Sequence, residues 1–143
     1  MNITYQQLGF IADTYIPILF LTSCVILIKE ISALGFKPNH QQIRSIILSV
    51  VVIFFIMLID SQLQIWSKIG LDYSTHTALS LVFVIFLSFK GKISLLLSVI
   101  SMVCYAILMM IQNYHTMADI LSTAIVIIPI LLFLQQKACR TRQ

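Results

Sequence analysis

Five long apolar stretches, separated by short polar segments, run through the sequence. They cover residues 14–28, 45–59, 73–89, 93–111 and 120–134. A helix needs about 20 residues to cross the hydrocarbon core of a bilayer, and each stretch approaches that length when it is extended by a turn or less. None of them shows the two-residue alternation of a membrane strand. We therefore predict five membrane helices, at approximately 8–29, 43–64, 73–89, 92–112 and 116–135.

The polar segments between the stretches carry turn signals. Gly35 and Pro38 lie in the first segment, and proline disfavours helix at the residue before it. Gly91 lies between two lysines in the third segment. A chain of 143 residues without an internal repeat or a Gly/Ser linker is expected to form one domain, residues 1–143. The predicted fold class is an all-α, polytopic helical bundle in a membrane.

The composition supports a membrane location. Hydrophobic residues make up 59% of the chain and charged residues only 10%, whereas a soluble domain carries about 25% charged residues. This composition excludes a water-soluble globule, and we expect no nucleic-acid partner.

Cys24, Cys104 and Cys139 lack the spacing of a disulfide framework or a metal site. The first twelve residues hold no Lys or Arg, so we expect the first stretch to be retained and not cleaved as a signal peptide.

The basic residues fall almost entirely on one side of the predicted bundle. Lys68 alone lies on the other side, together with most of the acidic residues, while the remaining basic residues are Lys29, Lys37, Arg44, Lys90, Lys92, Lys137, Arg140 and Arg142. The positive-inside rule assigns the basic side to the cytoplasm. We therefore predict an outer N-terminus and a cytoplasmic C-terminus, in the inner (cytoplasmic) membrane of a bacterium.

Two polar segments at the outer ends of predicted helices could carry chemistry. His115 and Asp119 are four residues apart, which places them on one face of a helix. A carboxylate that accepts a hydrogen bond from one imidazole nitrogen raises the basicity of the other, as in a nucleophilic or general-base histidine. His76 opens another helix at the same level and could supply the complementary acid.

The same region offers groups that could bind a phosphate. Ser74 or Thr75 is placed to cap a helix whose N-terminus would attract an anion. Lys68 is the one basic side chain on that side, and Asn113 could act as a neutral donor. The expected chemistry is phosphoryl transfer without a cofactor or metal ion.

Two motifs carry a family resemblance. Tyr73-Ser74-Thr75-His76-Thr77 is similar to P-S-G-H-T, and His115-x-x-x-Asp119-Ile-Leu is similar to H-x-x-x-D-V-L, both of the type 2 phosphatidic acid phosphatase superfamily. That superfamily includes lipid phosphate phosphatases and resembles the sphingomyelin synthases. The likeness covers residues 72–134 and implies that His115 is the nucleophile, that Asp119 orients it and that His76 protonates the leaving alcohol. The family's K-x6-R-P motif has no match, and Met109 stands where the family has an arginine.

The sequence therefore predicts a membrane phosphatase or phosphotransferase. It would act on a lipid or lipid-linked phosphate ester from the outer leaflet, through a phosphohistidine, with membrane lipids as its surroundings. One alternative is a catalytically inactive relative that binds lipid or a partner protein, because the basic motifs are missing. Another is a metal-dependent hydrolase, in which His76, His115 and Asp119, with Asp60 or Asp72, would hold a zinc ion. A transporter is disfavoured because the polar groups gather at one end of the bundle and not at mid-membrane.

Overall fold

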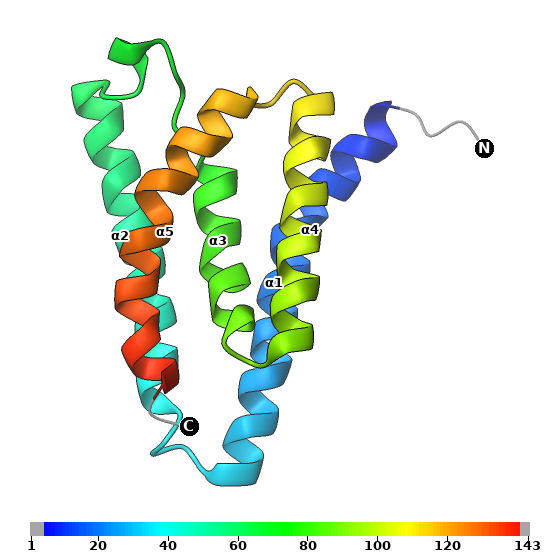
Figure 1. Ribbon diagram of the computed structural model, residues 1–143, viewed down its shortest axis with the longest axis vertical. Coiled ribbons are helices and arrows are strands. Elements are labelled where there is room, and N and C mark those ends of the chain that lie inside the picture. Colours follow the sequence, from blue (N-terminus) through cyan, green and yellow to red (C-terminus); the bar gives the residue numbers. More distant parts are fainter. Residues whose placement is uncertain (1–4, 141–143) are drawn as a thin grey trace.

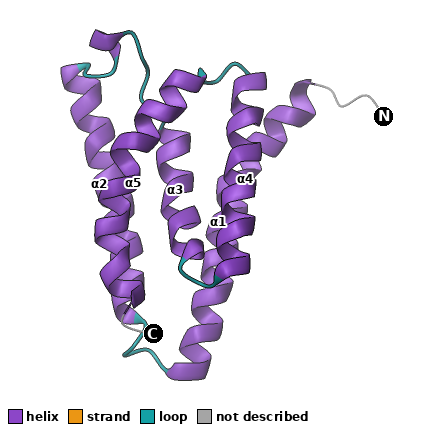
Figure 2. Ribbon diagram, in the orientation of Figure 1, coloured by secondary structure: helices purple, strands orange, loops and turns teal. Residues whose placement is uncertain are grey.

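Five α-helices and one short 3-10 helix make up the chain between residues 5 and 140. The structure is a computed structural model that describes these residues, with side chains from 7 to 139, and no strand occurs among them (Figures 1 and 2). The elements are α1 (Tyr5–Leu34), α2 (His40–Leu63), η1 (Ser67–Ile69), α3 (Thr75–Ser88), α4 (Lys92–Ile111) and α5 (Met117–Arg140). The predicted all-α fold is confirmed. Each helix begins and ends within about five residues of its predicted bounds.

The short helix α3 lies at the centre of the bundle and packs against all four other helices (Figure 1). Ten of its 14 residues are buried, as expected for a helix that is apolar on every face. At 1.5 Å per residue it is about 21 Å long, less than the 30 Å of a hydrocarbon core. Four helices in the described range are long and apolar enough to cross a membrane, whereas α3 is a shorter apolar helix, and its crossing stays a prediction.

The outer surface of the long helices is apolar. Large hydrophobic side chains point away from the bundle along its length, including Phe10, Ile93, Ile125 and Phe133, the last of which is 82% exposed. Water does not tolerate contiguous apolar surface on this scale, whereas lipid tails do. The fold and its surface are those of a helical membrane protein.

Charged groups are sorted between the two ends of the bundle. The α1–α2 and α3–α4 turns lie at the lower end in Figure 1, and the α2–α3 and α4–α5 connections lie at the upper end. The described basic residues other than Lys68 belong to lower-end segments, whereas Lys68 is on η1 at the upper end. Arg142 and the side chain of Arg140 lie outside the described residues. The side of the membrane that each end faces stays a prediction.

A cluster of polar side chains links the helices at the lower end of the bundle. Lys90 donates to both carboxylate oxygens of Glu30, at 3.0 and 2.9 Å, and to Oε1 of Gln42 at 2.7 Å. Its ammonium also lies 4.2 Å from the centre of the Phe86 ring. Asn39, which is fully buried, donates to the carbonyl oxygens of Glu30 and Gly35. These contacts join α1, α2 and the end of α3.

Candidate functional site

The two predicted histidines meet at the upper end of the bundle. His76 is the second residue of α3, and His115 lies in the turn between α4 and α5. Their ring centroids are 6.5 Å apart, and the ring planes are inclined at 57°. The His115 side chain is only 11% exposed, whereas His76 is exposed. The fold thus places two imidazoles from distant parts of the sequence side by side.

The end of α4 fixes the backbone around His115. Asn113 adopts a left-handed conformation with φ of 57°, as the residue after a helix often does. The amide of Tyr114 donates to the carbonyl of Met109 and the amide of Asn113 to that of Met110, both at 3.1 Å. This is the Schellman pattern of hydrogen bonds, in which an αL residue closes the helix. His115 therefore follows a fully bonded helix end and is held in a defined position.

Asp119 has a different role from the one that the sequence predicted. Its Oδ2 accepts the Thr116 amide at 2.8 Å and the Thr116 hydroxyl at 2.7 Å, while the Thr116 hydroxyl oxygen accepts the Asp119 amide at 3.3 Å. This is a capping box at the start of α5. The helix begins only at Met117, so His115 and Asp119 do not share a helical face, and no hydrogen bond joins them among the described side chains. The predicted orienting bond is therefore corrected.

The carboxylate that does approach His115 is that of Asp72. Its Oδ2 lies 3.6 Å from Nδ1 of His115, and this buried nitrogen has no hydrogen-bond partner within residues 5–140. The remaining oxygen of Asp119, Oδ1, accepts the backbone amide of Asp72 at 2.8 Å and so holds Asp72 beside the histidine. Sequence reasoning counted Asp72 only as a possible metal ligand. Its position directly before Tyr73-Ser74-Thr75-His76 was the available signal.

The protonation of His115 follows from this environment. Burial lowers the pKa of His115 below its ordinary value of 6.5, while the carboxylates of Asp72 and Asp119 oppose that shift. Desolvation outweighs the carboxylates because burial penalises the charged form directly. Burial therefore favours the neutral form of the His115 imidazole.

Ser74 is the N-cap of α3. It is fully buried, its Oγ accepts the Thr77 amide at 3.2 Å, and its hydroxyl donates to Oγ1 of Thr77 at 2.8 Å. Its own amide donates to Oγ1 of Thr123 in α5 at 3.0 Å. The predicted cap is confirmed, and its predicted contact with a substrate stays a prediction. Thr75 is half-buried beside it.

Two tyrosines surround His76. The hydroxyl of Tyr105 lies 3.5 Å from Nδ1 of His76, and the ring of Tyr114 is nearly parallel to the imidazole with centroids 6.2 Å apart. Tyr105 is buried and its ring stacks on Tyr15 of α1 at 4.1 Å. Nδ1 of His76 thus faces the tyrosine hydroxyl.

The α2–α3 connection is tied to the bundle, but Lys68 stays outside the histidine cluster. The Trp66 amide donates to Oδ1 of Asp60 at 2.9 Å, and the Trp66 indole donates to Oγ of Ser122 at 3.1 Å. Trp66 is 7% exposed, so it packs into the bundle. Lys68 is exposed on η1, and no contact in the described structure joins it to the histidines. Its predicted contact with a phosphate has no geometric support.

A small cavity of about 370 Å³ opens at the α4–α5 turn. Its lining residues are Met110, Asn113, Tyr114, His115, Thr116, Met117 and Asp119. Asn113, predicted to contact the substrate, therefore shares a cavity with His115. No Lys or Arg lines it. Within the described range, no group of three or more His, Cys, Asp or Glu side chains is placed to hold a metal ion, so the zinc-hydrolase alternative lacks a ligand set there.

Comparisons of the chain with protein-family models, with curated proteins and with solved structures found no match. The likeness to the phosphatase superfamily therefore rests on the two histidine motifs alone. What the geometry defines is a class of site: two histidines and a carboxylate at one end of a membrane helical bundle.

Proposed function

We propose that the chain is a membrane-bound phosphatase or phosphotransferase that acts on a lipid or lipid-linked phosphate ester. The observation that carries the proposal is the approach of the His76 and His115 rings to 6.5 Å, with a carboxylate of Asp72 beside Nδ1 of His115. Two adjacent imidazoles can supply the nucleophile and the acid that phosphoryl transfer needs. The membrane surface of the bundle supports a lipid substrate.

The proposed reaction has two steps. The Asp72 carboxylate, 3.6 Å from Nδ1 of His115, favours the tautomer with its proton on Nδ1, which leaves the lone pair on Nε2 to attack phosphorus. The P–O bond to the leaving alcohol breaks as the P–N bond forms, and His76 donates a proton to the departing oxygen. Water or a second alcohol then gives its proton to His76 and attacks the phosphohistidine. The P–N bond breaks, and phosphate or a new phosphate ester leaves.

The negative charge of the phosphate would be met mainly by neutral donors. The α3 N-terminus points its first amides toward this end of the bundle, and within residues 5–140 the amides of Thr75 and His76 have no hydrogen-bond partner. A helix N-terminus favours an anion. Asn113 adds a side-chain donor from the cavity wall.

The charge distribution supports an orientation in which the histidines face outward. The basic lower end would lie in the cytoplasm and the upper end at the outer face of a bacterial cytoplasmic membrane. A single cysteine introduced at Asn113 should then react with a membrane-impermeant maleimide added to intact cells. Reaction only after the cells are broken would show that the histidine end faces the cytoplasm.

Phosphate release from a panel of lipid phosphates tests the proposal. Replacement of a general acid or nucleophile costs about 100-fold or more, so His115→Ala and His76→Ala should each lose at least that much activity. His40→Ala is the matched control, because His40 is an exposed histidine at the opposite end. Full activity of His115→Ala would overturn the assignment.

One observation favours a second candidate, an inactive relative that binds lipid phosphates. No Lys or Arg lines the His115 cavity, whereas phosphoryl transfer usually draws on cationic side chains. Saturable binding of a lipid phosphate, lost in His115→Ala, without turnover of any member of the panel would support this candidate.

A further inference from the structure

A large groove lies between α1 and α4 in the lower half of the bundle, away from the histidines. Its volume is about 870 Å³, and its floor includes the end of α3. Its lining residues are Leu19, Thr22, Ile26, Leu87, Lys90, Gly91, Lys92, Ile93, Ser94, Leu97, Ser98 and Ser101. Most of this surface is apolar, and both lysines lie at one end of it.

The groove is about one lipid leaflet deep. On α4 it runs from Lys92 to Ser101, which is roughly 14 Å at 1.5 Å per residue, or about half of a 30 Å hydrocarbon core. At its upper end, Ser101 Oγ is hydrogen-bonded to the Tyr15 hydroxyl at 3.0 Å. An acyl chain that entered from the lower membrane surface would therefore fit along it.

The hydroxyl groups of the wall are already satisfied. Thr22 donates to the Ile18 carbonyl at 2.8 Å, Ser94 to the Leu87 carbonyl at 2.7 Å, and Ser98 to the Ser94 carbonyl at 2.6 Å. These hydroxyls therefore offer no free donor to an occupant of the groove, and an acyl chain needs none.

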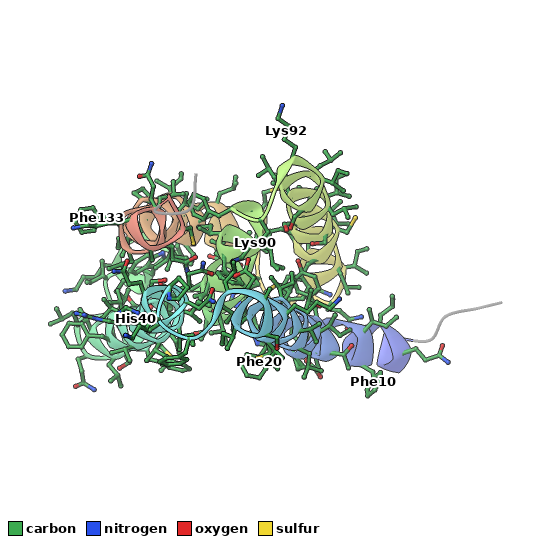
Figure 3. All side chains as sticks on the ribbon, turned by 90° about the horizontal axis from the view of Figure 1, so that it is seen from below. Phe10, Phe20, His40, Lys90, Lys92 and Phe133 are labelled. Atoms are coloured by element: carbon green, nitrogen blue, oxygen red, sulfur yellow. The ribbon has the colours of Figure 1, made fainter. Side chains whose placement is uncertain are left out.

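The lower end of the groove carries one uncompensated positive charge. Lys90 is neutralised by Glu30 and turns toward the centre of the bundle, whereas Lys92 projects away from it (Figure 3). Lys92 is exposed, and no ion pair involves it in the described part of the chain. A lysine at this level can place its ammonium at the membrane surface while its methylenes lie along apolar groups. The N-terminus of α4 adds further positive potential.

We propose that this groove binds an acyl chain of an anionic phospholipid from the lower leaflet, with Lys92 attracting the net negative charge of the headgroup, which a zwitterionic lipid lacks. The occupant is set by the apolar wall, the depth of one leaflet and Lys92, an exposed cation at the mouth that has no ion pair within the described residues. The site lies at the opposite end from His76 and His115, so it does not depend on the proposed phosphoryl transfer.

Native mass spectrometry of the full chain with added phosphatidylglycerol or phosphatidylcholine tests the site. Phosphatidylglycerol should be retained more strongly. Leu97→Trp, which fills the groove, should reduce its retention about tenfold, and Leu96→Trp should not, because Leu96 is equally exposed on α4 but does not line the groove. Lys92→Gln should remove the preference for the anionic lipid, whereas Lys68→Gln, at the other end, should keep it.

Three results would overturn the proposal. Equal retention of the two lipids would remove the role of Lys92. Equal loss in Leu96→Trp and Leu97→Trp would show that lipid binds to the general surface. A dimer that Leu97→Trp dissociates in size-exclusion chromatography with light scattering would identify the groove as a contact between two copies of the chain.

Discussion

The two carboxylates at the histidine site, those of Asp119 and Asp72, lie in different environments. Asp119 is buried and accepts three hydrogen bonds, two from Thr116 and one from the Asp72 amide. Asp72 has a 71% exposed side chain, and its carboxylate is the one that approaches His115. Asp119 thus stabilises the turn, and Asp72 lies beside the imidazole of His115.

Substitution should separate these two roles. Asp119→Ala removes a helix cap, which costs about 1–2 kcal/mol, so it should lower the thermal unfolding temperature in detergent. Asp72→Asn should change stability by less than about 0.5 kcal/mol, as exposed substitutions do. It should nevertheless reduce phosphate release about tenfold or more, because it removes the negative charge that lies 3.6 Å from Nδ1 of His115. Full activity of Asp72→Asn would contradict the role given to Asp72.

The lowered pKa of His115 predicts a pH dependence of stability. Because the folded-state pKa lies below the unfolded value of 6.5, the unfolded chain binds more protons in acid. The contribution of His115 to stability is therefore complete above pH 6.5 and is lost as the pH falls toward and through its folded-state pKa. His115→Gln should lose less stability than the parent chain between pH 7.5 and pH 5, measured by thermal unfolding. An identical loss in both proteins would contradict the assignment.

At the scale of helices and turns, the sequence predicted the positions of the helices better than the contacts between segments. All five helices could be predicted because long apolar stretches end at Gly, Asn or charged residues. The turn between the last two helices was also predicted, since the predicted bounds end at 112 and begin again at 116. The shared helical face of His115 and Asp119 was not found, because Thr116-x-x-Asp119 is a capping signal and α5 begins after it.

The lower-end cluster should contribute measurably to helix packing. Lys90→Met removes two charge-assisted hydrogen bonds to the partly buried Glu30 carboxylate and should cost about 1–3 kcal/mol. Lys92→Met, on the exposed lysine two residues away, should cost less than about 0.5 kcal/mol. Thermal unfolding of both variants in the same detergent gives the comparison. Equal losses would show that the Lys90–Glu30 pair does not stabilise the bundle.

At the scale of the whole molecule, the position of α3 is the feature that the sequence did not reveal. Every helix is strongly apolar, so hydrophobic periodicity cannot distinguish a side that faces lipid from a side that faces the core. The meeting of His76 and His115 depends on that position, since α3 is held to α5 by the bond from the Ser74 amide to Thr123. Both histidines could be selected from the sequence motifs, but their rings lie close together only because of the way α3 packs.

Trapping the covalent intermediate tests the proposed chemistry most directly. The protein, purified in detergent and mixed with a lipid phosphate, would be quenched within the first turnover at alkaline pH and analysed by peptide mass spectrometry. We predict an acid-labile phosphoryl group on His115 that is absent in His115→Ala. Turnover of the lipid phosphate with no phosphoryl group on His115, or with one on another residue, would contradict the proposed mechanism.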